Sequence, residues 1–310
     1  MYTGVDIGGT KCAVITADEK GNIINKIKFA TTTVDETIEN IISGIHELGC
    51  GDAIGISCGG PLDSKKGVIL SPPNLPGWDD IHIVDMLKKE FNVPVAIQND
   101  ANACALAEWK FGAGRGAENM VFLTFGTGLG AGLILDGKLY SGTNDMAGEV
   151  GHIRMSEFGP VGYGKAGSFE GYCSGGGIAK IAQTIATEQL QSGKTVSFCK
   201  SYDYLQNITA KSVAECAAAG NADAIRVYDI CAEKLGAGLS VIIDILNPEK
   251  IVIGSVFQRS ENLLRKKMQE VIDRETLSFS NKVCKVVAAE LGDSIGDVAA
   301  ISVAILAAEQ

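Results

Sequence analysis

The sequence predicts an α/β protein built from two similar halves, and three observations carry this prediction. Short β-branched runs alternate with longer segments of helical periodicity along the 310 residues, which is the pattern of an α/β fold. A strand, a glycine-rich turn and two further strands open the chain, and the same order of elements returns from residue 120. The length also exceeds the usual size of one domain, about 150 residues.

The first half is predicted to contain a three-stranded meander followed by alternating helices and strands. Its strands cover residues 2–7, 12–16, 23–29, 53–57 and 93–98. Its helices cover residues 34–48, 83–91 and 101–109. Gly49 is expected to end the first of these helices, because glycine is favoured just past a helix end.

The second half repeats the meander and then becomes largely helical. Its strands cover residues 120–125, 133–135, a short run after 138, 250–253 and 284–289. Its helices cover residues 176–190, 212–219, 223–246, 261–274 and 296–309. One face of the long helix is expected to be buried, formed by Tyr228, Cys231, Leu235, Leu239, Ile242 and Ile245. We place the boundary between the halves near residue 116.

Composition excludes several classes of partner. The net charge of −10 argues against a nucleic-acid-binding surface, which needs clustered Lys and Arg. The nine cysteines are scattered without a C-x-x-C pair, so we expect them to be small buried side chains in a reducing compartment. The start has no secretory signal, and the longest apolar run, residues 298–308, is too short to cross a membrane. We therefore expect a cytoplasmic protein that binds neither nucleic acid nor a membrane.

Asn99 and Asp100 stand where the strand at 93–98 meets the alanine-rich helix after it. In open α/β sheets, side chains at the carboxyl ends of strands face the ligand-binding crevice. One interpretation makes Asp100 a general base and Asn99 a residue that orients the substrate. The other is that one of the two caps the helix, since both residue types are favoured N-caps. This stretch alone favours the cap.

Two glycine-rich turns stand at equivalent places in the two halves. The turns contain Gly8, Gly9 and Thr10 in the first half and Gly126, Thr127 and Gly128 in the second. Neither is a Walker A loop or a dinucleotide fingerprint, and both join strand to strand. Glycine lets backbone N–H groups approach a phosphate closely, and the threonines add hydroxyl donors. Together the two turns favour a phosphate clamp between the halves.

An esterase is the rival interpretation from another class of enzyme. Residues 55–59 match G-x-S-x-G, with Ser57 as the nucleophile. That motif needs a helix directly after it, whereas Gly60 and Pro61 follow here, so we reject this interpretation. Within the Gly-rich loop at 141–177, Glu149 and His152 set an acid and a base three residues apart, which alone could be a surface ion pair.

Five motifs together resemble the ROK family of bacterial sugar kinases over essentially the whole chain. They are Asp6–Lys11, Pro73-Asn74 before Trp78, 99–103, 126–130 and 147–152. The resemblance implies an actin-like ATPase (ribonuclease H-like) fold of the hexokinase type, with two duplicated lobes around a central cleft. It implies lobes at 1–116 and 117–295, with the C-terminal helix 296–310 completing the first lobe.

The resemblance also implies a role for each matching residue. Asp100 corresponds to the catalytic base of an ATP-dependent kinase that phosphorylates a sugar hydroxyl. Sugar contacts are implied for Gly60, Asn74, Asn99, Asp100, Glu149, His152 and Glu170. Binding of ATP is implied for Asp6, Gly8, Gly9, Thr10, Lys11, Gly126, Thr127, Gly128 and Gly254, with Asp6 near Mg²⁺. Ser255 stands where a second glycine is usual.

One departure from the family concerns a zinc site. The family usually joins three cysteines to the loop histidine around zinc, and the corresponding positions here are Val161, Tyr163 and Ser168. A structural zinc site needs four ligands, so we predict that zinc is absent. His152 would then serve the sugar only, and packing of Phe158, Tyr163 and Phe169 would hold the loop at 153–170.

Several sugars are substrates within such families: glucose, fructose, mannose, N-acetylmannosamine, allose and β-glucosides. Glucose, phosphorylated to glucose 6-phosphate, is our default because the set of sugar-contact residues is complete. Part of the family consists of transcriptional repressors with an N-terminal helix-turn-helix domain. We disfavour that alternative because the chain begins at the first strand of the kinase core and is acidic. The resemblance alone implies a homodimer.

Overall fold

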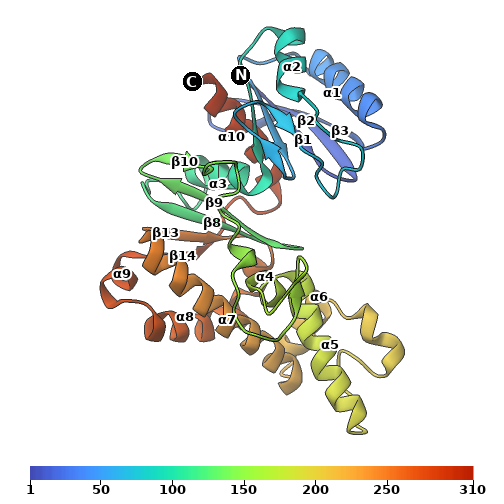
Figure 1. Cartoon of the computed structure of the whole chain (residues 1–310), viewed down its shortest axis with the longest axis vertical. Coiled ribbons are helices and arrows are strands. Elements are labelled where there is room, and N and C mark those ends of the chain that lie inside the picture. The colour runs from blue at the N-terminus through green and yellow to red at the C-terminus, as the bar shows by residue number, and fades with distance from the viewer. Residues whose placement is uncertain (310) are drawn as a thin grey trace. The chain divides into compact units, whose positions relative to one another are not determined.

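The computed structural model describes residues 1–309 and divides into two compact units (Figure 1). Unit 1 comprises Met1–Phe122, Gly132–Gly148 and the segment that begins at Glu290. Unit 2 comprises Leu123–Ala131 and Glu149–Ala289. The lobe boundary that the sequence places near residue 116 stays a prediction.

Unit 1 contains a five-stranded sheet in the order β3-β2-β1-β4-β7. The strands are β1 (Tyr2–Ile7), β2 (Lys11–Ala17), β3 (Ile23–Ala30), β4 (Ile54–Cys58) and β7 (Val95–Asn99). The first three strands pair antiparallel, whereas β4 is parallel to both β1 and β7. The predicted meander and the two strands after it are thereby confirmed, and the short hairpin of β5 (Leu62–Asp63) and β6 (Val68–Ile69) was not predicted.

Helices cover both faces of this sheet. They are α1 (Val34–Leu48), α2 (Ile83–Phe91), α3 (Asp100–Phe111) and α10 (Ile295–Ala308). Side chains alternate along β2, so Val14 joins the core beneath α1 while Ile15 packs with Ile301 of α10. A Cβ on Gly55 would overlap the backbone of α10, so glycine lets this helix lie directly on the strand.

The second sheet has the order β10-β9-β8-β13-β14, which repeats the order of the first. Its strands are β8 (Met120–Phe125), β9 (Leu129–Leu135), β10 (Lys138–Tyr140), β13 (Lys250–Ile253) and β14 (Lys285–Ala288). The boundary between the units falls within β8 and β9. The repeated order confirms the predicted duplication. The strand expected at 133–135 begins earlier, at Leu129, because Thr124 Oγ1 pairs with the backbone of Gly130 and continues the hairpin.

Short elements and helices make up the rest of the second half. The short elements are η1 (Val150–His152), β11 (Val161–Gly162), β12 (Lys165–Ala166), α4 (Phe169–Tyr172) and η2 (Tyr202–Asn207). The main helices are α5 (Gly175–Gln191), α6 (Ala210–Ala218), α7 (Ala222–Leu246) and α8 (Val256–Glu275). The short α9 (Ser278–Val283) and η3 (Gly292–Ser294) were not predicted.

Two predictions about the helices need correction. Ile245 does not belong to the buried face of α7, because it lies on the last turn and is 73% exposed. The helix expected from residue 261 begins at Val256, five residues earlier, and Ser260 interrupts it with non-helical dihedral angles. Within residues 1–309, no helix is both long and apolar enough to span a membrane.

Candidate functional site

The joint between β7 and α3 carries Asn99 and Asp100. Asn99 is extended, and its Oδ1 accepts the N–H of Asn102 at 2.8 Å, which makes Asn99 the N-cap of α3. Asp100 is the first helical residue, and its Oδ1 accepts the N–H of Ala101 at 2.9 Å. The prediction that one of the two residues caps the helix is confirmed, and the capping residue is Asn99. Asp100 is therefore left with a carboxylate that the cap does not use.

The Asp100 carboxyl is exposed to solvent although protein atoms surround it closely. Loss of surrounding water raises the pKa of Asp100, and the hydrogen bond from Ala101 acts in the opposite direction. Asp6 of β1 has its pKa raised to about 6, first by burial and second by the nearby charge of Asp297. Carboxylates whose pKa is raised by their surroundings are candidates for proton transfer or cation binding.

The first glycine-rich turn is a tight hairpin that lies against the Asn74 loop. The N–H of Gly8 donates to the carbonyl of Lys11 at 3.1 Å and closes the turn. A Cβ on Gly9 would overlap the carbonyl oxygen of Asn74, so only glycine permits this approach. The Asn74 side-chain amide lies 3.2 Å from the ideal Cβ position of Gly59, at the end of β4. The turn and a predicted sugar-contact residue are thus neighbours within unit 1.

The second glycine-rich turn lies beside two other backbone segments of unit 2. The N–H of Gly126 donates to the carbonyl of Gly128 at 3.1 Å, and the N–H of Gly175, the first residue of α5, donates to the carbonyl of Gly126 at 2.8 Å. The Ser255 hydroxyl lies 3.7 Å from the ideal Cβ position of Gly126. The Gly254–Ser255 segment therefore borders the turn, and its predicted role in binding the nucleotide stays a prediction.

Three predicted sugar-contact residues stand on η1 and α4. Glu149 and His152 flank η1, and both are exposed. Glu170 lies in the first turn of α4, and its Oε2 accepts the N–H of Leu129 at 3.0 Å. The same oxygen lies 2.7 Å from the ideal Cβ position of Gly128. Glu170 thus connects the predicted sugar-binding segment to the second glycine-rich turn.

Each unit carries its own share of the predicted site residues. Unit 1 contains Asp6, Gly8, Gly9, Thr10, Lys11, Gly60, Asn74, Asn99 and Asp100. Unit 2 contains Gly126, Thr127, Gly128, Glu149, His152, Glu170 and Gly254. Within each unit the structure brings the glycine-rich turn next to a predicted sugar-contact residue, Asn74 in unit 1 and Glu170 in unit 2. Their roles stay predictions.

The loop at 153–170 is held only in part in the way the sequence suggested, because Phe169 packs it and the other two aromatic residues do not. Phe158 is 79% exposed and Tyr163 is 78% exposed, so neither packs the loop. Phe169 is fully buried, and its ring occupies the space where a Cβ on Gly238 of α7 would lie. Polar side chains of the loop bond its backbone instead; for example, Arg154 donates to the carbonyl of Ala166 at 2.9 Å. Residues 1–309 contain no group of three or more His, Cys, Asp or Glu side chains placed to hold a metal.

Sequence reasoning missed Glu108, a buried carboxylate on α3 that anchors the helix carrying Asp100. Its side chain accepts the N–H groups of Ala113 at 2.8 Å, Glu290 at 3.0 Å and Leu291 at 2.9 Å. The one sequence feature that relates to this role is Gly112, because a Cβ at that position would overlap the Glu108 carboxylate. Asp297, which raises the pKa of Asp6, was missed too because it lies 291 positions further along the chain.

The esterase interpretation is wrong on local structure. Ser57 is buried within β4, and the strand is followed by Gly59–Pro61 and the β5–β6 hairpin instead of a helix.

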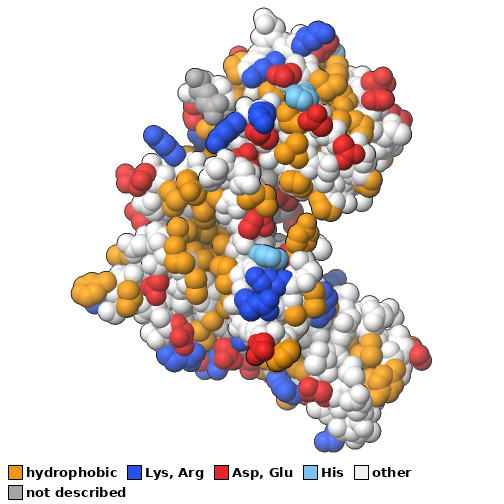
Figure 2. Space-filling view, viewed as in Figure 1, with side chains coloured by type: hydrophobic (Ala, Val, Ile, Leu, Met, Phe, Trp, Pro, Cys, Tyr) orange, Lys and Arg blue, Asp and Glu red, His pale blue; other side chains and the backbone are white. Residues whose placement is uncertain are grey.

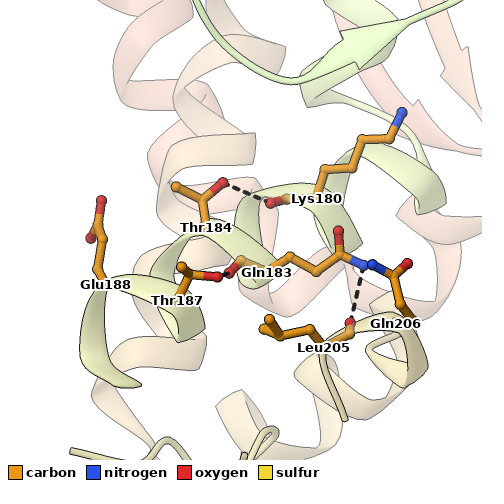
Figure 3. A pocket seen from close by; sticks show the side chains of 7 residues that line it. All are labelled: Lys180, Gln183, Thr184, Thr187, Glu188, Leu205 and Gln206. Atoms are coloured by element: carbon orange, nitrogen blue, oxygen red, sulfur yellow. Dashed lines mark hydrogen bonds between the residues drawn. The ribbon is translucent and has the colours of Figure 1, made fainter. Parts of the chain in front are cut away.

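A hollow of about 490 Å³ between α5 and η2 is lined by polar side chains, Leu205 and the stem of Lys180 (Figure 3). It contains none of the predicted site residues.

Comparisons with known proteins point to one family. A model of the ROK family matches residues 2–307. A glucokinase of Halalkalibacterium halodurans is 35% identical over 309 residues, covering 95% of this chain and 92% of that protein. The crystal structure of a ROK family glucokinase from Streptomyces griseus in complex with glucose and AMPPNP is 30% identical, covers 98% of this chain and 99% of its own, and has a TM-score of 0.76. A xylose repressor of Caldicellulosiruptor bescii is 27% identical over 94% of this chain and 74% of the repressor.

Proposed function

The chain belongs to the ROK family, has the actin-like ATPase fold and is an ATP-dependent sugar kinase, and we propose that it converts glucose to glucose 6-phosphate with Asp100 as the general base. One observation carries the assignment of the base. Asp100 presents a solvent-accessible carboxylate with a raised pKa at the end of β7, while the neighbouring Asn99 performs the capping.

In this proposal Asp100 accepts the proton of the sugar O6 hydroxyl as that oxygen attacks the γ-phosphorus of ATP. The O6–phosphorus bond forms, the bond from phosphorus to the bridging oxygen of ADP breaks, and ADP leaves. A carboxylate base of this kind typically contributes about 10²–10⁴-fold to the rate. A raised pKa suits the role, because it makes the carboxylate a better proton acceptor than an ordinary aspartate.

The remaining residues would bind and orient the two substrates. Phosphoryl transfer depends mainly on positioning and on stabilising charge, which the backbone N–H groups of the two glycine-rich turns would provide to the phosphates. Asn99 uses Oδ1 for the cap, so its NH₂ group is the part we assign to the sugar. Asn74, Glu149, His152 and Glu170 offer the donors and acceptors that a polyhydroxylated, uncharged ligand needs.

Magnesium is implied by the family, and the acidic surroundings of Asp6 fit it. Burial and the charge of Asp297 raise the pKa of Asp6 to about 6, while Lys26, which pairs with Asp297, acts in the opposite direction. A bound divalent cation would stabilise the ionised form of this buried carboxylate. Asp6 would hold the ion beside the first glycine-rich turn. When bound with ATP, Mg²⁺ neutralises charge on the phosphates.

A repressor function is the alternative from another class. On the face shown in Figure 2, Lys and Arg side chains occur in small groups between Asp and Glu side chains. With a net charge of −10, this surface favours small-molecule substrates over DNA.

Location and assembly complete the proposal. All nine cysteines are free, which supports a reducing, cytoplasmic location. The proposal includes a homodimer, which rests on the family resemblance.

A coupled assay of ADP release tests the substrate. Glucose, fructose, mannose, N-acetylmannosamine, allose and a β-glucoside would be compared at equal concentrations with Mg-ATP. We expect the highest kcat/KM for glucose. A higher value for another sugar would correct the substrate, and no ADP release with any sugar, together with a gel shift of promoter DNA, would favour the repressor.

A further inference from the structure

The residues at the family's zinc positions do not fit a zinc site in this chain. Structural zinc is bound by Cys, His, Asp or Glu, and none of these residue types stands at positions 161, 163 and 168. The Ser168 hydroxyl caps α4 instead, because its Oγ accepts the N–H of Gly171 at 3.1 Å. The loop nevertheless joins His152 to Glu170, two predicted sugar-contact residues. Something other than zinc must therefore fix its conformation.

The backbone of the loop closes on itself. Strands β11 and β12 pair antiparallel, and the carbonyl of Gly167 accepts the N–H groups of Met155 at 2.8 Å and Ser156 at 3.2 Å. The N–H of Phe169 donates to the carbonyl of Ile153 at 2.8 Å, so the two ends of the loop are held together. These bonds define the loop, and Lys180 of α5 attaches β11 by donating from Nζ to the carbonyl of Val161 at 2.5 Å. The turn at 156–159 needs a separate attachment.

Tyr172 makes that attachment from the last residue of α4. Its side chain is buried, and its hydroxyl donates to the carbonyl of Phe158 at 3.2 Å and lies 2.9 Å from Ser156 Oγ. A Cβ on Gly159 would overlap this hydroxyl, so glycine lets the loop backbone pass directly over it. The hydroxyl thus holds the turn at 156–159 against the helix that carries Glu170.

Lys234 of α7 adds a second attachment at the same place. Its Nζ lies 5.2 Å from the centre of the Tyr172 ring and donates to the carbonyl of Met155 at 3.4 Å. Lys165 acts at the other end of the loop, where its Nζ donates to the carbonyl of His152 at 2.6 Å. Cationic side chains and one buried hydroxyl thereby bind the carbonyl oxygens of the loop.

We propose that Tyr172, together with Ser156 and Lys234, is a metal-free cross-link that fixes the 153–168 loop and thereby positions Glu170 and His152 for the sugar. Tyr172 is a positioning residue, since it acts through the loop and not on the substrate itself. The effect on the sugar rests on the proposed function, whereas the effect on the loop does not.

The test compares Tyr172→Phe with Tyr228→Phe. Both variants remove one hydroxyl from a buried tyrosine of unit 2, and Tyr228 bonds the carbonyl of Ala210 at 3.0 Å, away from the loop. Hydrogen exchange of residues 153–168 is measured in the full chain before and after treatment with a zinc chelator. We expect Tyr172→Phe to speed this exchange about tenfold, which is the effect of one lost hydrogen bond, and Tyr228→Phe to leave it unchanged. Chelation should change nothing.

Kinetics of the same variants provide the second readout. Tyr172→Phe should raise KM for the sugar about tenfold while KM for ATP stays within about twofold, and Tyr228→Phe should alter neither. Ser156→Ala serves as a second variant with the same expected direction should Tyr172→Phe fail to fold. Unchanged exchange in both loop variants, or stoichiometric zinc whose removal speeds exchange, would overturn the inference. Faster exchange in a protein that phosphorylates no sugar would instead count against the proposed function alone.

Discussion

Asn99 and Asp100 are adjacent, yet their side chains have separate structural tasks. The side-chain oxygen Oδ1 of Asn99 accepts the N–H of Asn102, one of the donors that a helix start leaves unpaired. Asp100, already inside the helix, keeps its carboxylate exposed. Helix capping and the proposed general-base catalysis are therefore compatible here, because different residues would perform them.

Substitutions at Asn99 separate its capping role from its proposed contact with the sugar. Asn99→Asp keeps a good cap, so its free energy of unfolding should stay within about 0.5 kcal/mol of the wild type. Asn99→Ala removes the cap and should lower it by about 0.5–2 kcal/mol. Both variants lose the amide NH₂ group and should raise KM for the sugar. A normal KM in Asn99→Asp would leave Asn99 with the structural role only, and denaturant unfolding measures the stability of each variant.

The raised pKa of Asp100 predicts how the rate depends on pH. Only the ionised form accepts a proton, so kcat/KM should fall as pH decreases through the pKa of Asp100 in the free enzyme. Because the close surrounding protein atoms displace water and raise this pKa, the fall should begin above the range of an ordinary aspartate, about 3.9. The measurement is kcat/KM for glucose against pH, with circular dichroism to verify that the fold persists. A rate that falls only in the range of an ordinary aspartate, about 3.9, would speak against Asp100 as the base.

At the scale of elements, the strands were easier to predict than the segments that connect them. The bounds of β8 and β13 match the sequence prediction because a buried, mainly apolar run is followed by glycine in both cases. The start of α8 was missed although Ser255 and Gln258 have the S-x-x-Q spacing of a capping box, and the predicted start falls just after Ser260, where the helix is interrupted. Exposed Phe158 and Tyr163 were misjudged because hydrophobicity alone does not reveal which side of a loop faces the core.

Ser255→Gly tests the strain at the start of α8. A residue with a Cβ at φ +57° and ψ −109° is strained, so glycine should raise the free energy of unfolding by about 1 kcal/mol. The variant also loses the exposed hydrogen bond that Arg259 donates to Ser255 Oγ, which should lower the free energy of unfolding only slightly. Thermal unfolding measures the difference, and Ser192→Gly at the end of α5, where φ is −86°, is the control that should not gain stability. A gain in both variants, or in neither, would contradict this account.

For the whole molecule, two sheets of the same strand order explain why each unit supplies a glycine-rich turn and its own neighbouring side chains. The sequence displayed this duplication because strand, turn and strand recur with little change. Glu108 and Asp297 escaped prediction because their partners lie far along the chain and no local pattern marks them. The choice among sugars likewise depends on the arrangement of several loops, which no single motif encodes.

The account as a whole depends on Asp100 being the base of a sugar kinase, and Asp100→Asn tests this most directly. Glucose-dependent ADP release would be measured together with glucose binding by calorimetry. Asp18→Asn, which changes a partly exposed carboxylate in a hairpin turn of unit 1, is the control. We predict that Asp100→Asn lowers kcat by at least about 10²-fold while glucose still binds and the protein unfolds normally. The control should retain its rate. A kcat within a few fold of the wild type in Asp100→Asn would contradict the central claim.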